Sequence, residues 1–173
     1  KFTGIDVWDR QVDAEGPTPR EASLVNDGGK LWVLGLKTEQ PHTAIKTVHG
    51  GKTELHGGFL FPVVNVPTAT PAFIAEDSQQ SLTYLVQASL PSVNYYVQVR
   101  EIVKRTVRNL LRSSVLLRGT TSGSMMPLYV GQREGGEPPP PPPSTVGCAP
   151  TAATILGLLT LGILTVTLWV RGW

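Results

Sequence analysis

The chain has 173 residues, with 18 glycines, 15 prolines and only 16% charged residues, which argues against a helical bundle and favours a turn-rich β architecture. Its formal net charge of +2 is too small to indicate a nucleic-acid partner. The single cysteine, Cys148, excludes an internal disulfide, so no covalent framework supports the fold.

A 22-residue repeat marks the N-terminal half. The stretch 28–35 (GGKLWVLG) returns as 50–57 (GGKTELHG), with the double glycine, the lysine and the later glycine in register. A period of this length, with glycines at the turns and strand-forming residues between them, is typical of one coil of a parallel β-helix. Such coils cannot bury their inner faces alone. We therefore expect a piece of a larger β-helix or a cap to one, with upstream coils if the sequence is a fragment beginning at Lys1.

Strand signals are strongest in four stretches bounded by Gly, Pro, Asn or Asp turns: 30–38, 53–64, 72–86 and 95–103. Because the two Gly-Gly-Lys turns correspond, equivalent strands are expected to stack in parallel, coil upon coil. Alternation along the strands predicts that four side chains point into the core: Leu31, Val33, Leu55 and Phe59. The apolar run of Trp32, Leu34 and Leu36 leaves open which face of the first strand is buried.

The segment 100–117 carries two conflicting patterns. Basic residues recur every four positions beside an apolar stripe, as in a basic amphipathic helix. The β-branched residues and the alternation over 95–103 instead favour strands. We interpret the segment as two strands joined by a tight turn at Lys104 and Arg105, with the helix as the alternative.

The C-terminal part differs in composition from the rest. Six consecutive prolines, 138–143, predict a polyproline II rod of roughly 19 Å, which suits a stalk. The uncharged run 151–170 would reach roughly 30 Å as a helix and predicts a transmembrane span, with Arg171 favouring an exterior body. Cys148 precedes this run and is a candidate for processing or lipidation. The expected divisions are a β-helix cap, a stalk, a span and a tail: 1–130, 131–150, 151–170 and 171–173.

The segment 26–39 (NDGGKLWVLGLKTE) resembles bacterial proteins of the pectate lyase superfamily, some of them related to family 55 glucanases. The stretches 44–64, 71–78 and 99–110 resemble the following coils and a terminal hairpin of that group. The resemblance covers about residues 5–130 and implies the C-terminal end of a right-handed parallel β-helix. The turn at Lys104–Arg105 departs from the pattern by lacking a glycine. No catalytic residue of the family carries over.

Candidates for carbohydrate chemistry are few. Hydrolysis or lysis of a polysaccharide needs carboxylates, for which the candidates are Glu54, Glu76 and Asp77. A lyase would also use Ca²⁺, but no motif supports it, so no cofactor is expected. The three histidines, spaced seven apart, do not imply a metal site. Four aromatic residues are candidates for stacking on sugars: Trp8, Trp32, Tyr95 and Tyr96.

These patterns together predict an all-β, membrane-tethered, extracytoplasmic β-helix module at the cell surface. It would serve as a structural cap and as a polysaccharide-binding part of a larger carbohydrate-active protein. One alternative is a glycoside hydrolase or polysaccharide lyase with its site in or next to these coils. A second is a stalked β-sandwich adhesin, which would require antiparallel pairing of 31–38 with 53–61.

Overall fold

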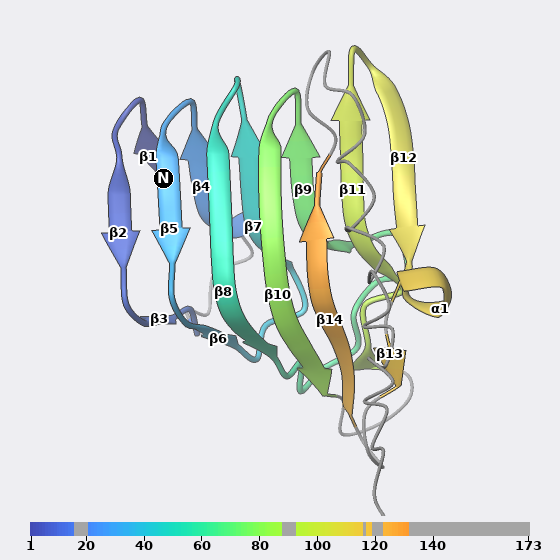
Figure 1. Ribbon diagram of the computed structural model, residues 1–173. Coiled ribbons are helices and arrows are strands. Elements are labelled where there is room, and N and C mark those ends of the chain that lie inside the picture. The colour runs from blue at the N-terminus through green and yellow to red at the C-terminus, as the bar shows by residue number, and fades with distance from the viewer. Residues whose placement is uncertain (16–20, 88–92, 116, 119–122, 132–173) are drawn as a thin grey trace, which may run out of the picture. The chain divides into compact units, whose positions relative to one another are not determined.

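A computed structural model describes residues 1–15, 21–87, 93–115, 117–118 and 123–131 (Figure 1). All of them belong to a unit that spans Lys1–Pro139. In these residues the chain winds through about four turns of a parallel β-solenoid, in which successive coils add strands to two sheets. The predicted parallel β-helix is therefore confirmed, whereas the expected stalk and span, 131–150 and 151–170, lie outside the described residues except for Gly131.

Two sheets form the walls of the solenoid. Sheet A contains six strands in spatial order: β1 (Phe2–Thr3), β4 (Ala22–Asp27), β7 (Thr43–Val48), β9 (Pro71–Glu76), β11 (Val97–Val103) and β12 (Thr106–Leu111). Sheet B contains eight, the main path being β2 (Val7–Asp9), β5 (Lys30–Val33), β8 (Lys52–Leu60), β10 (Gln79–Gln87), β14 (Gly123–Val130) and β13 (Leu117–Arg118). Beside this path β3 (Val12–Asp13) pairs with β6 (Leu36–Thr38), which also pairs with β8. Side chains from both sheets meet in one apolar core.

The sequence repeat corresponds to strand register. Strands β5 and β8 are parallel, with Lys30 opposite Lys52 and Val33 opposite Leu55, so the members of each pair are separated by one period of the repeat. The antiparallel pairing needed for a β-sandwich does not occur between these strands, and that interpretation is wrong. Other coils are longer than this period, since Phe2 lies opposite Asn26 and Lys52 lies opposite Gln79.

Three of the four inward candidates are correct. Leu31, Val33 and Leu55 are almost fully buried, but Phe59 is only partly buried and Leu60 faces the core instead. The pairing of β8 with β10 explains the change, because His56 pairs with Thr83 and Gly58 with Tyr84, leaving Gly57 as an extra residue. A bulge of this kind shifts the facing of every later residue in the strand.

The predicted strand stretches are interrupted at turns. The stretch 30–38 divides into β5 and β6, and 72–86 divides into β9 and β10 at Asp77–Ser78. The stretch 53–64 ends as a strand at Leu60. Outside the four stretches and the predicted hairpin, the described residues also form β1 to β4, β7, β13 and β14, and of these β1, β4 and β7 build the first coils of sheet A.

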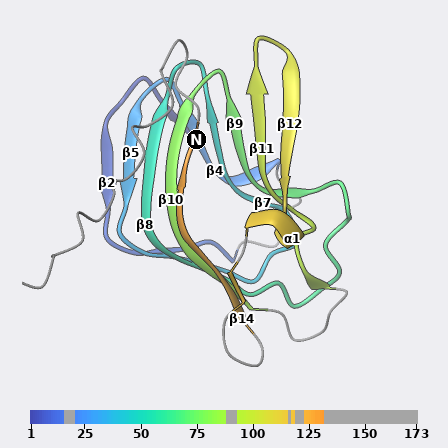
Figure 2. The same ribbon diagram turned by 45° about the vertical axis from the view of Figure 1, so that its right-hand side comes forward.

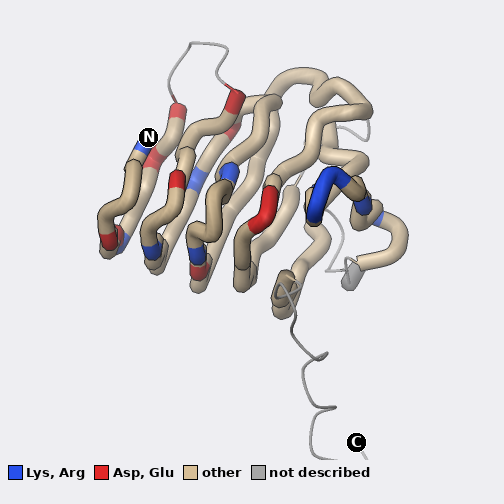
Figure 3. Tube along the Cα trace, turned by 90° about the horizontal axis from the view of Figure 1, so that it is seen from above, with Lys and Arg blue, Asp and Glu red and all other residues tan. Residues whose placement is uncertain are grey.

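Tight turns with positive φ connect sheet A to sheet B at the same corner in successive coils. They include Gly28 (φ 83°), Gly50 (φ 74°) and Asp77 (φ 42°). Backbone hydrogen bonds join these turns along the stack: Gly28 N donates to Val48 O (3.1 Å) and Gly50 N donates to Asp77 O (2.9 Å). Charged residues recur along the coils (Figure 3), and one such pair at this corner joins Lys1 to Asp27 at 2.7 Å.

A buried polar ladder lies just inside this corner. The amide nitrogen of Asn26 donates to Thr53 Oγ1 (3.0 Å), and Thr53 Oγ1 lies 2.8 Å from Thr47 Oγ1. Gln80 Nε2 then donates to both Thr47 Oγ1 and Ile74 O at 2.8 Å. The ladder therefore connects three successive coils through side chains that are almost completely buried.

Antiparallel elements close the far end of the stack (Figure 2). Strands β11 and β12 form a hairpin, and β14 pairs antiparallel with β10. The predicted turn at Lys104–Arg105 is confirmed, and the helical alternative is wrong over 100–111 because β11 and β12 occupy those positions. A short helix, α1 (Arg112–Val115), follows β12.

The hairpin turn is conformationally strained. Lys104 and Arg105 both have positive φ, 48° and 71°, where asparagine and glycine are strongly preferred in two-residue hairpins. Replacing the pair in the double variant Lys104→Asn/Arg105→Gly is expected to raise the free energy of unfolding by about 1 kcal/mol. Urea unfolding of the variant checks this, and a fall in the midpoint would contradict it.

Candidate functional site

Two of the four aromatic candidates form one surface on the outer face of sheet B. Trp8 of β2 lies opposite Trp32 of β5, and their rings stack with centroids 4.9 Å apart and an interplanar angle of 3°. Trp8 remains 71% exposed. The next residues in this row are Glu54 and then Ser81, which belong to β8 and β10. The row runs across the strands, so successive coils each contribute one side chain to it.

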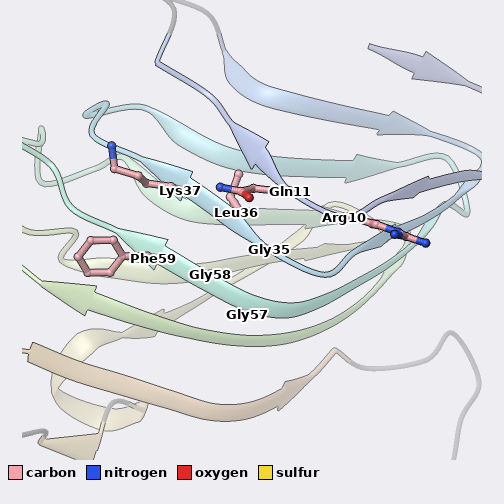
Figure 4. Close-up of a pocket in the computed structure, with 8 residues that line it drawn as sticks. All are labelled: Arg10, Gln11, Gly35, Leu36, Lys37, Gly57, Gly58 and Phe59. Carbon is pink, nitrogen blue, oxygen red and sulfur yellow. The ribbon is translucent and has the colours of Figure 1, made fainter.

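A shallow groove of about 290 Å³ lies further along these strands, at the bend where β2 leads to β3 and β5 leads to β6 (Figure 4). Its lining comes from three neighbouring coils: Arg10, Gln11, Gly35, Leu36, Lys37, Gly57, Gly58 and Phe59. In Figure 4, Lys37 and Phe59 lie toward one end of the groove and Arg10 toward the other. It therefore combines cationic, amide and aromatic groups.

Glycines create this groove. A Cβ at Gly35 would come within 3.3 Å of Arg10 O, and one at Gly57 within 3.4 Å of Leu34 O. The backbones of adjacent coils thus approach closely at the bend, and no side chain fills the outer surface there. The groove was not among the predicted sites, although the later glycine of the 22-residue repeat, at positions 35 and 57, was its signal in the sequence.

Lys37 is held at the groove by two carboxylates. It forms a hydrogen-bonded ion pair with Glu15 and a second one with Glu39 at 2.9 Å. The hydrogen bond to Glu15, followed by that to Glu39, raises the pKa of Lys37, while the same contact lowers the pKa of Glu15. Lys37 therefore stays charged, and its position is set by its partners.

The two tyrosine candidates lie elsewhere. Tyr95 is completely buried, and its hydroxyl is 2.7 Å from the carbonyl oxygens of Gln40 and His42. Tyr95 therefore has no face open to a sugar and serves the packing of the core. Tyr96 is 53% exposed but precedes β11 in sheet A, so it does not join the tryptophan pair.

The three carboxylate candidates have different partners. Glu54 lies on the outer face of sheet B, where its carboxylate is 3.1 Å from His56. Glu76 ends β9 of sheet A and faces Lys46 at 3.6 Å. Asp77 lies in the corner turn and accepts a hydrogen bond from Lys104 N at 2.8 Å. Glu54 therefore lies on a different sheet from Glu76, the chain neighbour of Asp77, and each carboxylate has its own partner.

The histidines have separate partners as well. His42 contacts Ser23 Oγ at 3.0 Å, His49 contacts Asp27 at 2.5 Å, and His56 contacts Glu54. Within the described ranges, no cluster of three or more His, Cys, Asp or Glu side chains could hold a metal ion. Cys148 lies outside those ranges. The described part of the chain also contains no helix long and apolar enough to cross a membrane.

Comparison with known proteins adds no family assignment. No protein-family model matches the chain, and no match was found among curated proteins or solved structures.

Proposed function

We propose that this chain is the terminal module of an extracytoplasmic β-solenoid protein, closing its end and binding polysaccharide. One observation carries the capping role. The stack begins with the parallel strands β1 and β2, each at the edge of its sheet, and ends in the antiparallel β11–β12 hairpin and β14. A parallel edge can accept another coil in the same register, whereas an antiparallel hairpin ends the progression. The resemblance to the pectate lyase superfamily is part of this proposal.

Coil addition tests the cap. Residues 21–45, which include one full coil, are copied in front of Lys1, and a scrambled copy of the same composition serves as the control. Because solenoid stability grows with each coil interface, the copied coil is expected to raise the unfolding midpoint in urea and the scrambled one to leave it unchanged. Equal midpoints for the two extended chains would contradict an accepting edge.

The stacked tryptophans support the polysaccharide-binding part of the proposal. Flat aromatic side chains provide a large rigid contact area for an amphipathic ligand at a small loss of conformational entropy. Trp8 is exposed and lies on the strand that leads to the groove-lining residues Arg10 and Gln11. A sugar chain crossing the coils would contact the aromatic rings and the polar groups of the groove along one sheet face.

Truncation of Trp8 is the direct test of this surface. Trp8→Ala is expected to weaken binding of the full chain to a polysaccharide selected on a glycan array by about tenfold, since one stacking contact is removed. Calorimetric titration measures the change. Tyr96→Ala, which removes an exposed aromatic side chain outside the surface, should leave binding unchanged. Equal loss in both variants would contradict the assignment.

The alternative function is a glycoside hydrolase or polysaccharide lyase. The position of Glu54 beside Trp32 and within 3.1 Å of His56 is the observation that favours it. A turnover assay on polysaccharides separates the two functions: cleavage by the chain that is lost in Glu54→Gln would replace binding by catalysis. Glu76→Gln and Asp77→Asn test the other two candidates in the same assay.

The membrane tether remains part of the proposal, together with the stalk and the localisation at the cell surface. It is supported by the uncharged run 151–170, which has the length of a membrane span. The full chain is expected to partition into detergent, whereas a chain ending at Gly136 stays in buffer. Equal solubility of the two would count against the tether.

A further inference from the structure

The β11–β12 hairpin carries an unusual concentration of positive charge. Its residues, 97–111, contain four of the 15 basic residues of the chain and one acidic residue, a net charge of +3. The acidic residue, Glu101, points into the structure and is only 5% exposed; Tyr129 Oη donates a hydrogen bond to it at 2.5 Å, and Arg108 lies 3.4 Å away. The turn at Lys104 and Arg105 is therefore an exposed pair of cations, blue in Figure 3, and the carboxylate of Asp77 accepts a hydrogen bond from Lys104 N at 2.8 Å.

Two of these cations occupy the strained turn. Lys104 and Arg105 have positive φ at a position where asparagine and glycine would relieve the strain. Backbone strain of this kind persists where surrounding structure maintains it, and it is concentrated at functional positions. The turn therefore keeps two long basic side chains at the exposed end of the hairpin even though they reduce stability.

Apolar side chains lie directly behind the turn. Val107 is 55% exposed, and it pairs across the hairpin with Ile102, which is partly buried. Arg100 lies two positions before Ile102 on the same face and is fixed by hydrogen bonds to Ala69 O and Asn109 Oδ1, both at 2.9 Å. Arg100, Ile102 and Val107 lie on one face of the hairpin beside the cationic turn, so this face combines cations with an exposed valine, as segments that bind the interface of an anionic bilayer do.

We propose that the β11–β12 hairpin is a second membrane contact, which binds an anionic phospholipid surface through Arg105 and its basic neighbours and inserts Val107 at the headgroup boundary. The exposed valine favours a lipid surface over a soluble polyanion, because a soluble polyanion offers no apolar layer for it. This contact goes beyond the tether proposed for 151–170 and does not need it. It would orient the solenoid against the bilayer rather than anchor it there.

A fluorophore on the hairpin tests the proposal in the full chain. Asn109→Cys, in a Cys148→Ser background, is labelled with an environment-sensitive dye, because Asn109 is exposed and lies on the same face of the hairpin as Val107. The probes are vesicles of phosphatidylcholine alone and of phosphatidylcholine with phosphatidylglycerol. We expect a blue-shifted, stronger emission with the anionic vesicles only, and its loss in high salt, which screens surface charge. The dye reports on the hairpin whether or not the apolar run inserts, so a failed tether leaves this readout intact.

The variant Lys104→Asn/Arg105→Gly removes both cations while suiting the turn, so it should fold and lose the lipid-dependent signal. The matched control Lys30→Gln/Lys52→Gln removes the same charge from sheet B and should retain it. Four results would overturn the proposal: no signal with either vesicle, equal signals with both, an unchanged signal in the turn variant, or a signal produced by soluble dextran sulfate but not by vesicles. The last result would assign the hairpin to soluble polyanions instead.

Discussion

Gly29→Ala is expected to lower the free energy of unfolding by about 3 kcal/mol. A Cβ at Gly29 would lie 2.0 Å from Ile5 O and 2.9 Å from Ile5 C. These are backbone atoms of the preceding coil, so they cannot move aside as a side chain would. The first coil would have to separate from the second, which weakens the pairing of β2 with β5. Urea unfolding followed by circular dichroism measures the loss.

Gly50, the first glycine of the second Gly-Gly-Lys turn, provides the control for Gly29→Ala. Gly50 has φ 74°, and no heavy atom lies within 4 Å of the position of its Cβ. Gly50→Ala therefore encounters only the conformational penalty of the left-handed region, about 1 kcal/mol. A similar loss in Gly29→Ala and Gly50→Ala would show that close coil approach is not what requires glycine at position 29.

The difference between Gly29 and Gly50 shows which features of the structure the 22-residue repeat could predict. The pattern Gly-Gly-Lys predicted parallel coils and their register, because two turns of identical sequence at a constant spacing impose equivalent strand positions. It could not distinguish the two glycines: the first of each pair, Gly28 or Gly50, adopts positive φ, whereas Gly29 provides space for Ile5. The next coil is longer, since Lys52 lies opposite Gln79, and this change of length removed any further repeat from the sequence.

The candidate site was only partly predictable for a related reason. Trp8 and Trp32 are distant in the sequence, and only the strand register shows that they stack. Tyr95 carries the same side-chain chemistry as Tyr96 but is buried, a difference that depends on how the chain enters β11. The groove arises where side chains are missing at Gly35 and Gly57. Patterns of functional residue types do not reveal a surface formed by absent side chains.

Asn26→Leu is expected to destabilise the protein by about 3 kcal/mol or more, because it removes one residue from the buried ladder that connects the coils. Asn26 is fully buried, and its side-chain amide both donates and accepts hydrogen bonds. Its Nδ2 donates to Gly29 O, Lys52 O and Thr53 Oγ1 at 3.0 to 3.1 Å, and its Oδ1 accepts from Gly29 N at 3.2 Å. Leucine has a similar volume but leaves these buried backbone groups without their partner, and such groups are costly to bury unpaired.

The exposed residue Asn65 serves as the matched control, and Asn65→Leu should change the unfolding free energy by less than about 0.5 kcal/mol. Both variants are compared by urea unfolding, and a loss in Asn26→Leu no larger than that in Asn65→Leu would refute the role of the ladder. A large loss would also bear on the cap. Asn26 in β4 bonds to the backbone of β8, so it ties the second coil, against which the edge strands β1 and β2 pair, to the third coil. An edge that accepts another coil must itself be rigid, and this single amide, together with Gly29, holds the turn between β4 and β5 in the shape that the next coil repeats.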